Sequence, residues 1–430
     1  MMNKQEEDLP DPLRDRPFNP WREPKTEKAQ AIVRDVVNQL QDYEVQFQLR
    51  QRKRRKADQE TFEATISALV CDLIHHHLTA SGNGVFITRS HVQLGQVGRY
   101  KPRAFSKTLP DILNRLSSPE LAFLEQKMGH KGFFGPAKKT TIRAGGSLIM
   151  QVQEHGITLD DLKRSDNEEV IHLKRTKDGY WDEASLIDYE DTPTTTLYRE
   201  QMGKINSWLE QADLEFDESC QDEDCPVDVT GRRLHRVFTR GRFDRGGRLF
   251  GGFWLGLKKT QRRKGLLING EEAVELDFSQ MGPRIIYGLC GRRLPMDDAY
   301  MIPGFEAYRP GIKKVMNSMF FVEAPLTRMP RGVRKEFEDN HSIAEVTNAI
   351  ESAHPAIKQT FYTGIGHEVQ FIESQILVDI LLSLIDQDTT ALPIHDAILV
   401  PASRKEISKK IMLSIFSRHA GVKGLIKEDV

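Results

Sequence analysis

The sequence predicts an α+β protein, in which a mostly helical N-terminal part precedes a C-terminal part built on an antiparallel sheet. Three observations lead to this prediction. The chain has 430 residues, which is enough for two or three domains. Apolar residues recur at helical spacing in the N-terminal part. After about Arg232 the chain becomes strand-rich, and Asn269 and Gly270 stand between two apolar runs, a typical hairpin signal.

Shifts in composition divide the chain into four expected segments. The first is a polar and basic extension that contains an amphipathic helix from about Glu27 to Arg54. The third is acidic and rich in loops, apart from a small helical element near Thr196–Ala212. The four segments are residues 1–57, 58–155, 156–230 and 231–430.

The second segment begins with a predicted helix over residues 60–81. It contains three consecutive histidines, His75 to His77. Neighbouring residues on a helix diverge by about 100°, so these side chains cannot all face one metal ion. We therefore expect a partly exposed helix end rather than a metal site.

The rest of the second segment combines a helix with a basic hairpin. Residues 105–118 read as a helix with a proline inside it or at its first turn, and two strands around a Gly- and Lys-rich loop follow. Helices followed by a basic hairpin resemble a winged-helix module. That resemblance implies DNA binding, which is the usual use of helix-turn-helix folds.

Charge is strongly segregated along the chain, although the net charge is only −1. Arg232–Lys264 holds twelve Lys or Arg and one acid, whereas Asp213–Asp228 holds eight acids and no base. Because apolar and Gly residues interrupt the first block, we expect a folded surface that binds nucleic acid. A second basic run, Arg50–Lys56, fits a polyanion partner and a solvated tail equally well. No membrane-spanning run or signal peptide is evident, and we expect a cytoplasmic location.

The last segment places ionisable residues at the ends of predicted elements. Asp277 follows an apolar strand and precedes a helix, a position that a helix cap would also explain. Arg309 and Lys313 are four residues apart and project from one face of the next helix, with Phe321 eight residues beyond Lys313. Two cations and an aromatic ring on one face suit a nucleoside triphosphate.

A long helix and a final strand complete the segment. The helix is predicted over Gly366–Ile385, with His367, Gln370 and Ser374 as its polar stripe. The run Leu392–Leu399 is apolar, but it contains His395 and Asp396, and a strand cannot hide both of them on one face. Ser403 and Glu406 then fit a capping box that begins another helix.

These parts match the needs of phosphoryl transfer. Two metal ions held by carboxylates clamp the attacking and leaving oxygens, and cations neutralise the triphosphate. The order Asp-x-Ser-Gln-x-x-x-Arg from Asp277, then Arg-x-x-x-Lys-(x)7-aromatic from Arg309, then His-Asp at His395, resembles motifs A, B and C of family A DNA polymerases. The related single-subunit RNA polymerases share this scheme. The resemblance covers about residues 232–430 and implies a right-hand polymerase palm with helical fingers, preceded by a small thumb-like element.

The resemblance implies a role for each matching residue. Two Mg²⁺ ions, which Mn²⁺ can replace, would be held by Asp277, the backbone carbonyl of Phe278 and Asp396. The nucleoside triphosphate would be bound by Arg309, Lys313, Phe321, Asn317, Gly282, Ser279 and Gln280. The DNA primer–template would lie against Arg248, Arg245, Arg284, Gln370 and His395. Of these, Arg248 belongs to "DRGGRLF", which resembles an element of the RNA polymerases with one difference in spacing.

Two positions depart from the pattern of either class. Family A DNA polymerases carry a Glu where this chain has Gly282, and the RNA polymerases carry a Tyr where it has Phe321. The chain thus lacks the bulk of one class and the hydroxyl of the other, and we expect weak discrimination between dNTPs and rNTPs. Asn317 stands where many members have Phe or Tyr, and the sequence offers no account of it.

The sequence therefore predicts a compact template-directed DNA polymerase without proofreading and with low processivity. A replication initiator, helicase or processivity factor is the expected kind of partner, in a plasmid or phage setting. One alternative is an RNA polymerase or primase of the same superfamily. The other is a DNA-binding replication initiator with a decayed polymerase domain, against which the presence of Asp277, Arg309, Lys313 and Asp396 argues.

Overall fold

The structure is a computed structural model that describes residues 15–79, 84–130, 138–177, 182–220, 227–337 and 341–429. The chain forms two compact units. The first unit is Met1–Glu169 with Gln221–Thr230, and the second unit is Val170–Cys220 with Gly231–Val430. The acidic segment expected as a connector is thus divided between both units, because its middle part supplies a helix and two strands of the second unit.

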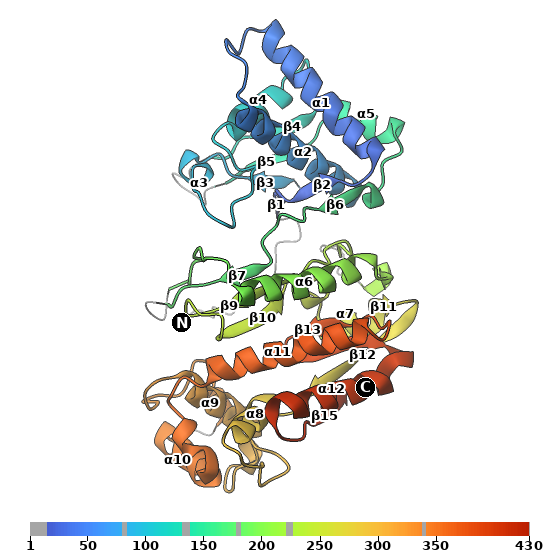
Figure 1. The fold of residues 1–430 in the computed structure, drawn as a ribbon. Coiled ribbons are helices and arrows are strands. Elements are labelled where there is room, and N and C mark those ends of the chain that lie inside the picture. Colours follow the sequence, from blue (N-terminus) through green and yellow to red (C-terminus); the bar gives the residue numbers. More distant parts are fainter. Residues whose placement is uncertain are drawn as a thin grey trace, which may run out of the picture. The chain divides into compact units, whose positions relative to one another are not determined.

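The first unit combines helices with two small sheets (Figure 1). Its described helices are α1 (Glu27–Gln46), α2 (Lys56–Thr79), α3 (His91–Leu94), α4 (Leu109–Leu116) and α5 (Gly146–Glu154). Its described strands are β1 (Arg16–Pro17), β2 (Arg22–Pro24), β3 (Val85–Ile87), β4 (Leu124–Lys127), β5 (Thr140–Ala144) and β6 (Leu162–Arg164). One sheet has the order β1-β3-β5-β4, with β1 and β3 parallel and the other pairs antiparallel, and β2 pairs with β6.

Helix α1 belongs to the core of the first unit. It ends at Gln46, eight residues before the predicted end, and buries Ile32, Val36 and Leu40 against the same apolar cluster as α2. Most of the basic run Arg50–Lys56 is exposed between the two helices. Arg54 is the exception, because it pairs with the buried Glu44 at 2.6 Å.

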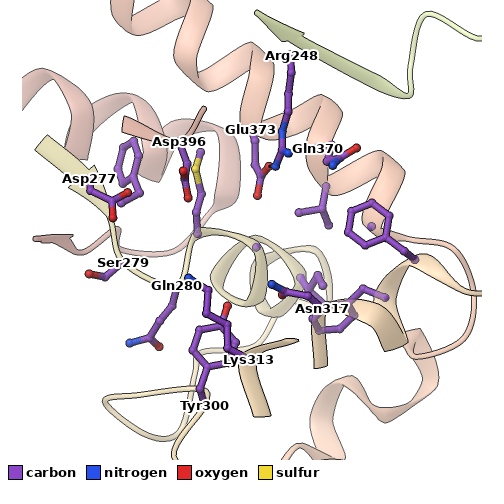
Figure 2. A pocket seen from close by; sticks show the side chains of 18 of the residues that line it. Arg248, Asp277, Ser279, Gln280, Tyr300, Lys313, Asn317, Gln370, Glu373 and Asp396 are labelled. Atoms are coloured by element: carbon purple, nitrogen blue, oxygen red, sulfur yellow. The ribbon is translucent and has the colours of Figure 1, made fainter. Parts of the chain in front are cut away.

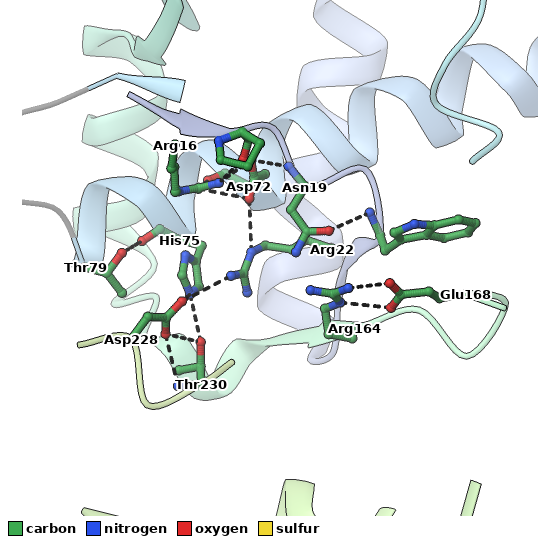
Figure 3. Close-up of polar contacts among 12 residues, drawn as sticks. Arg16, Asn19, Arg22, Asp72, His75, Thr79, Arg164, Glu168, Asp228 and Thr230 are labelled. Atoms are coloured by element: carbon green, nitrogen blue, oxygen red, sulfur yellow. Dashed lines mark hydrogen bonds and ion pairs between the residues drawn. The ribbon is translucent and has the colours of Figure 1, made fainter. Parts of the chain in front are cut away.

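A buried polar network fixes the start of the first unit on α2 (Figure 3). The carboxylate of Asp72 is fully buried and accepts from Arg16 and Arg22 at 2.9 and 3.0 Å. His75, one turn later, lies 2.9 Å from the Thr230 hydroxyl and 3.3 Å from Asp228. The expectation of a partly exposed helix end was wrong for His75 and His76, which are buried. His75 packs inward because the returning segment at Asp228 and Thr230 offers it polar partners.

The second unit surrounds one long helix, α11 (Figure 1). Its described helices are α6 (Pro193–Gln211), α7 (Lys259–Gly265), α8 (Met281–Leu289), α9 (Arg309–Phe321), α10 (Ile343–Ala353), α11 (Gly366–Ile385) and α12 (Lys405–Ala420). Its described strands are β7 (Ile171–Leu173), β8 (Leu214–Phe216), β9 (His235–Phe238), β10 (Gly246–Phe250), β11 (Leu266–Ile268), β12 (Glu271–Phe278), β13 (Leu392–Ile394), β14 (Ala397–Pro401) and β15 (Ile426–Asp429).

These strands form two sheets. The larger is antiparallel, in the order β13-β14-β12-β11-β8, and β15 pairs with the far end of β12. The predicted hairpin is confirmed, because Asn269 and Gly270 join β11 to β12 with φ values of 55° and 72°. The smaller sheet, β10-β9-β7, has β9 and β7 parallel. Helix α11 packs against β10, α6, α8, α9 and α12.

Two local predictions in the second unit were wrong. Leu392–Leu399 is not one strand: His395 and Asp396 form the turn between β13 and β14, so neither needs to enter the apolar interior. The capping box at Ser403 does not form, because the Ser403 hydroxyl donates to Glu271 at 2.7 Å and α12 begins only at Lys405. Among the described helices, none combines the length and apolar character needed to cross a membrane.

Candidate functional site

A cavity of about 390 Å³ lies in the second unit where β12, β14, α8, α9 and α11 meet. Figure 2 shows the side chains that converge on it from these separate elements. Twelve of the fifteen residues predicted for the site line it: Arg248, Asp277, Phe278, Ser279, Gln280, Gly282, Arg309, Lys313, Asn317, Phe321, Gln370 and Asp396. The lining among described residues holds three carboxylates and four cations, so the cavity is highly charged.

Asp277 and Asp396 come from neighbouring positions at the end of the larger sheet. Asp277 pairs with Ala397 in the β12–β14 ladder, and the Phe278 amide donates to the Asp396 carbonyl at 3.3 Å. Asp396 directly precedes β14, in the turn whose first residue, His395, has φ of +52°. The antiparallel register therefore brings two carboxylates, 119 positions apart in the chain, to one rim of the cavity.

Helix α9 supplies two of the four cations in the described lining. Arg309 begins the helix and Lys313 follows one turn later, so both reach the cavity from the same face. The Arg309 Nε donates to Asp298 at 2.5 Å, and its guanidinium lies 5.5 Å from the centre of the Tyr300 ring. Burial alone would raise the pKa of Asp298, but its hydrogen bond from Arg309 lowers that pKa overall.

Gln280 links two parts of the site. These are the 297–300 loop, which binds Arg309 through Asp298, and strand β12, which carries Asp277. Gln280 adopts a left-handed conformation, φ +57° and ψ +37°, immediately before α8. Its side-chain oxygen accepts from the Ala299 amide at 2.8 Å, and its amide donates to the Asp297 carbonyl at 3.0 Å. The backbone strain of a left-handed non-glycine residue is thus offset by two hydrogen bonds that fix the 297–300 loop.

Glu373 is the third carboxylate of the cavity. It projects from α11, its side chain is only 12% exposed, and it accepts from Arg248 of β10 at 2.9 Å. Its other oxygen lies 3.7 Å from the position that a Cβ on Gly282 would take. Burial raises the pKa of Glu373, and the nearby Asp396 adds to this rise, although Arg248 opposes it.

Three predicted residues do not line this cavity. Arg245 forms ion pairs with Asp244 and Glu368, both at 3.4 Å. Arg284 lies on α8 and donates to the Asp297 carbonyl at 3.5 Å, and burial lowers its pKa. His395 is exposed at the β13–β14 turn, beside Asp396.

Several lining residues were not predicted. Glu373 follows Gln370 by three positions and so shares its helical face, a spacing that could have revealed it. Lys427 stands opposite Asp277 in the β12–β15 pair, and no motif marks it. Tyr300 comes from an irregular loop, so neither periodicity nor spacing could have placed it in the cavity. Burial raises its pKa well above the usual range.

The donor set at the rim suits a hard divalent cation. Mg²⁺ prefers oxygen ligands and keeps several waters, so it is commonly bound by one or two carboxylates together with substrate phosphates. Asp277 and Asp396 offer such oxygens, and both are partly accessible from the cavity. No set of three or more His, Cys, Asp or Glu suited to a metal ion occurs among the residues that the structure describes.

Comparison with known proteins identifies no family. No protein-family model and no curated protein matches the sequence. Among the solved structures that match is the POL domain of Pol1 from M. smegmatis, in complex with DNA primer-template and dNTP. The identity is 10% and the TM-score is 0.30, over 55% of this chain and 51% of that one, so the chain spans about half of that structure's length. A similarity this weak carries no weight for function, which has to be inferred from the site itself.

Proposed function

We propose that the second unit is a template-directed nucleotidyltransferase, a compact DNA polymerase that adds nucleotides to a primer. The observation that carries the proposal is the convergence of carboxylates and cations on one cavity. Asp277 and Asp396 stand at one rim, and Arg309 and Lys313 reach the same cavity from α9. A nucleoside triphosphate needs both features, because metal ions bridge its phosphates and cations neutralise the charge that develops on transfer.

The residues divide the substrate between them. Arg309 and Lys313 bind the triphosphate, while Phe321, Asn317, Ser279, Gln280 and Gly282 bound the sugar and base. The ring of Phe321 is fixed by its edge contact with His367 at 5.1 Å and by close packing on Gly366. This rigidity suits a surface against which a sugar or a base must lie flat.

Asp277 and Asp396, assisted by the Phe278 carbonyl, would hold two Mg²⁺ ions, and Mn²⁺ can take their place. Bound there, the ions supply charge stabilisation to the attacking and leaving oxygens. The chain's own contribution is the pairing of β12 with β14, which places Asp277 next to Asp396, the residue that directly precedes β14.

The primer–template is proposed to lie against Arg248 and Gln370, which line the cavity, and against Arg245, Arg284 and His395, which do not, with His395 at the primer end. The enzyme would accept both dNTPs and rNTPs and would lack proofreading. The small size of Gly282 supports the acceptance of both sugars, although the carboxylate of Glu373 borders the space beside it. The lack of proofreading predicts that a primer with a mismatched 3′ nucleotide is extended without prior removal of that nucleotide.

Primer extension on a labelled primer–template with magnesium tests the proposal. Four arms are needed: dNTPs, rNTPs, no template, and the Asp396→Asn variant. We expect template-matched extension that this variant loses by a factor of at least about a thousand, since it removes a metal ligand. Equal extension by the variant, or none by a folded wild-type protein on any template, would overturn the assignment.

A second candidate is a DNA-binding replication initiator, and the first unit favours it. Its elements follow the order α2, β3, α3, α4, β4, β5, with β5 between β3 and β4 in the sheet. This order supports the winged-helix resemblance and a DNA-binding role. Selection of bound duplexes from a random pool would test it. A recurrent bound sequence together with failed primer extension would favour the initiator. A recurrent bound sequence together with template-matched extension would indicate an origin-specific polymerase.

A further inference from the structure

The smaller sheet of the second unit has two chemically different faces. On β9, Arg236 and Phe238 are buried and contact α11 and α6: Arg236 donates to Ser374 at 3.1 Å, and Phe238 stacks on Tyr198 at 5.2 Å. Residues alternate between faces along a strand, so His235 and Val237 belong to the opposite face, where both are partly exposed.

A row of aromatic rings crosses that face from strand to strand. The centre of the His172 ring on β7 lies 4.3 Å from that of His235 on β9. The His235 ring in turn stacks at 6.1 Å on Phe250 of β10, at an interplanar angle of 27°. Phe250 is 38% exposed, which is unusual for so large an apolar side chain. The three rings therefore stack on one another in a row, and Phe250, the most exposed of them, ends the row and can take a further ring on its face.

Cations border the same face. A cavity of about 580 Å³ runs over it, with Val237, Thr239, Gly246 and Phe250 in its lining. Among the described residues that line it are five cations and one carboxylate: Lys174, Arg175, Lys177, Arg240, Arg248 and Glu183. Salt bridges hold Arg175 to Asp182 at 2.7 Å, Arg240 to Glu323 at 2.6 Å and Arg248 to Glu373 at 2.9 Å. With these partners and Glu183 counted, the five cations still exceed the four carboxylates by one, and Lys174 and Lys177 are the lining cations on which the inference rests.

This cavity adjoins the proposed catalytic cavity. Arg248 and Gln370 line both of them, so the two cavities are direct neighbours in the second unit. Arg248 belongs to β10 and Gln370 to α11, and these two elements pack against each other. The two cavities therefore share part of one wall, which β10 and α11 form.

We infer that this face binds a single-stranded nucleic acid, namely the unpaired part of the template. Exposed aromatic rings on a sheet stack bases, and neighbouring cations contact the phosphates. A duplex does not fit, because its bases already stack on one another. The inference that a single strand binds here rests on the residues of this face alone. The inference that this strand is the template also rests on the proposed polymerase function.

Fluorescence anisotropy with labelled oligo-dT and with blunt duplex, on the full chain, tests the inference. The variants are Phe250→Ala and the double variant Lys174→Ala/Lys177→Ala. Matched controls are Leu197→Ala, which removes a 51% exposed apolar side chain from α6, and Lys410→Ala, which removes an exposed cation from α12. Thermal unfolding of each variant confirms that it is folded.

We expect Phe250→Ala to weaken oligo-dT binding about tenfold, in the range for loss of one stacked base, and to leave blunt-duplex binding unchanged. The double lysine variant should lower the slope of log affinity against log salt by about 0.7 for each phosphate that a lysine no longer neutralises. Both controls should behave as wild type. Equal oligo-dT affinity in all five proteins overturns the inference, as does a changed oligomeric state of Phe250→Ala with unchanged affinity.

The failure of this inference and that of the proposed function are distinguishable. If the wild-type protein extends no primer while Phe250→Ala still weakens oligo-dT binding, the single-strand site stands and the polymerase does not. If extension depends on Asp396 but oligo-dT affinity is unaffected by Phe250→Ala, the polymerase stands and the site does not. A photoreactive base in the template overhang should, in addition, crosslink to β9 or β10.

Discussion

Glu373 of α11 lies directly beside Gly282 of α8: one carboxylate oxygen is 3.7 Å from the position that a Cβ on this glycine would occupy. The acidic side chain from one helix thus borders the space that the glycine leaves in the other, without filling it. A change at either position alters the width of the cavity that both residues line.

This relationship predicts opposite effects on sugar selection. Glu373→Ala should widen the cavity and lower the preference for dNTPs over rNTPs by up to about tenfold, which is 1.4 kcal/mol. Gly282→Ala should be tolerated, since its Cβ would meet only ordinary contacts at 3.7 Å, and should raise the preference. The measurement is kcat/KM for matched dATP and ATP. A shift in the same direction for both variants would contradict this account.

Asp298 should act as a positioning residue for the triphosphate. Asp298 accepts a hydrogen bond from the Nε of Arg309, and this bond fixes the orientation of the guanidinium and hence the directions of its two outer nitrogens. We expect Asp298→Ala to raise the KM for nucleotide about fivefold to tenfold, with a smaller change in kcat. Glu306→Ala, on the preceding turn, serves as a control. An unchanged KM in Asp298→Ala would show that Arg309 needs no such support.

The buried His75 should make the first unit sensitive to acid. Burial, which outweighs the attraction of Asp228, lowers the pKa of His75 below its ordinary value of 6.5. The unfolded chain therefore binds more protons than the folded one as pH falls through about 6.5. The free energy of unfolding therefore has its full value above this pH. It falls as the pH drops from there toward the lower pKa of His75 in the folded protein.

Thermal unfolding from about pH 7.5 to about pH 5 measures the effect. His75→Gln, whose amide stays neutral, should flatten the decline in the unfolding temperature of the first unit. His77→Gln is the matched control, because His77 is exposed on the same helix. Parallel curves for wild type and His75→Gln would contradict the assignment.

Gly288 should be irreplaceable where α8 meets the end of α12. A Cβ there would stand 1.8 Å from the Ala420 carbonyl oxygen, so the helices would have to separate. We expect Gly288→Ala to lower the free energy of unfolding by about 1–3 kcal/mol. Gly203→Ala on α6, where a Cβ would meet nothing within 4 Å, should raise it by about 0.5–1 kcal/mol. Denaturant titration of both variants separates crowding from the general effect of a helical alanine.

Much of the second unit could be predicted because local signals agreed with the fold. The bounds of α11 follow from its apolar stripe, and the β11–β12 turn follows from Asn269 and Gly270. The end of the strand that carries Asp277 also has a local signature, and the ladder between β12 and β14 then brings Asp277 next to Asp396.

The errors arise where a long-range partner decides the local structure. His395 adopts φ of +52° without a glycine to signal it, so the β13–β14 turn looked like continuous strand. Ser403 prefers Glu271, which lies 132 positions away, to its own helix. Tyr300 reaches the cavity only because Gln280 and Arg309 fix its loop, and no pattern in the loop itself encodes that placement.

The division of the chain has a consequence for any fragment of this protein. The first unit is interrupted, since Val170–Cys220 belong to the second unit and the chain then returns with Gln221–Thr230. A fragment that starts at Gly231 would lack β7 and β8, and would expose the backbone of β9 and β11 to unwanted strand addition. A fragment that starts at Val170 would keep Asp228 and Thr230 but would deprive them of Arg22 and His75. The two units therefore cannot be exchanged between proteins as successive modules. Gene fusions or circular permutations would have to preserve all three points at which the chain passes from one unit to the other.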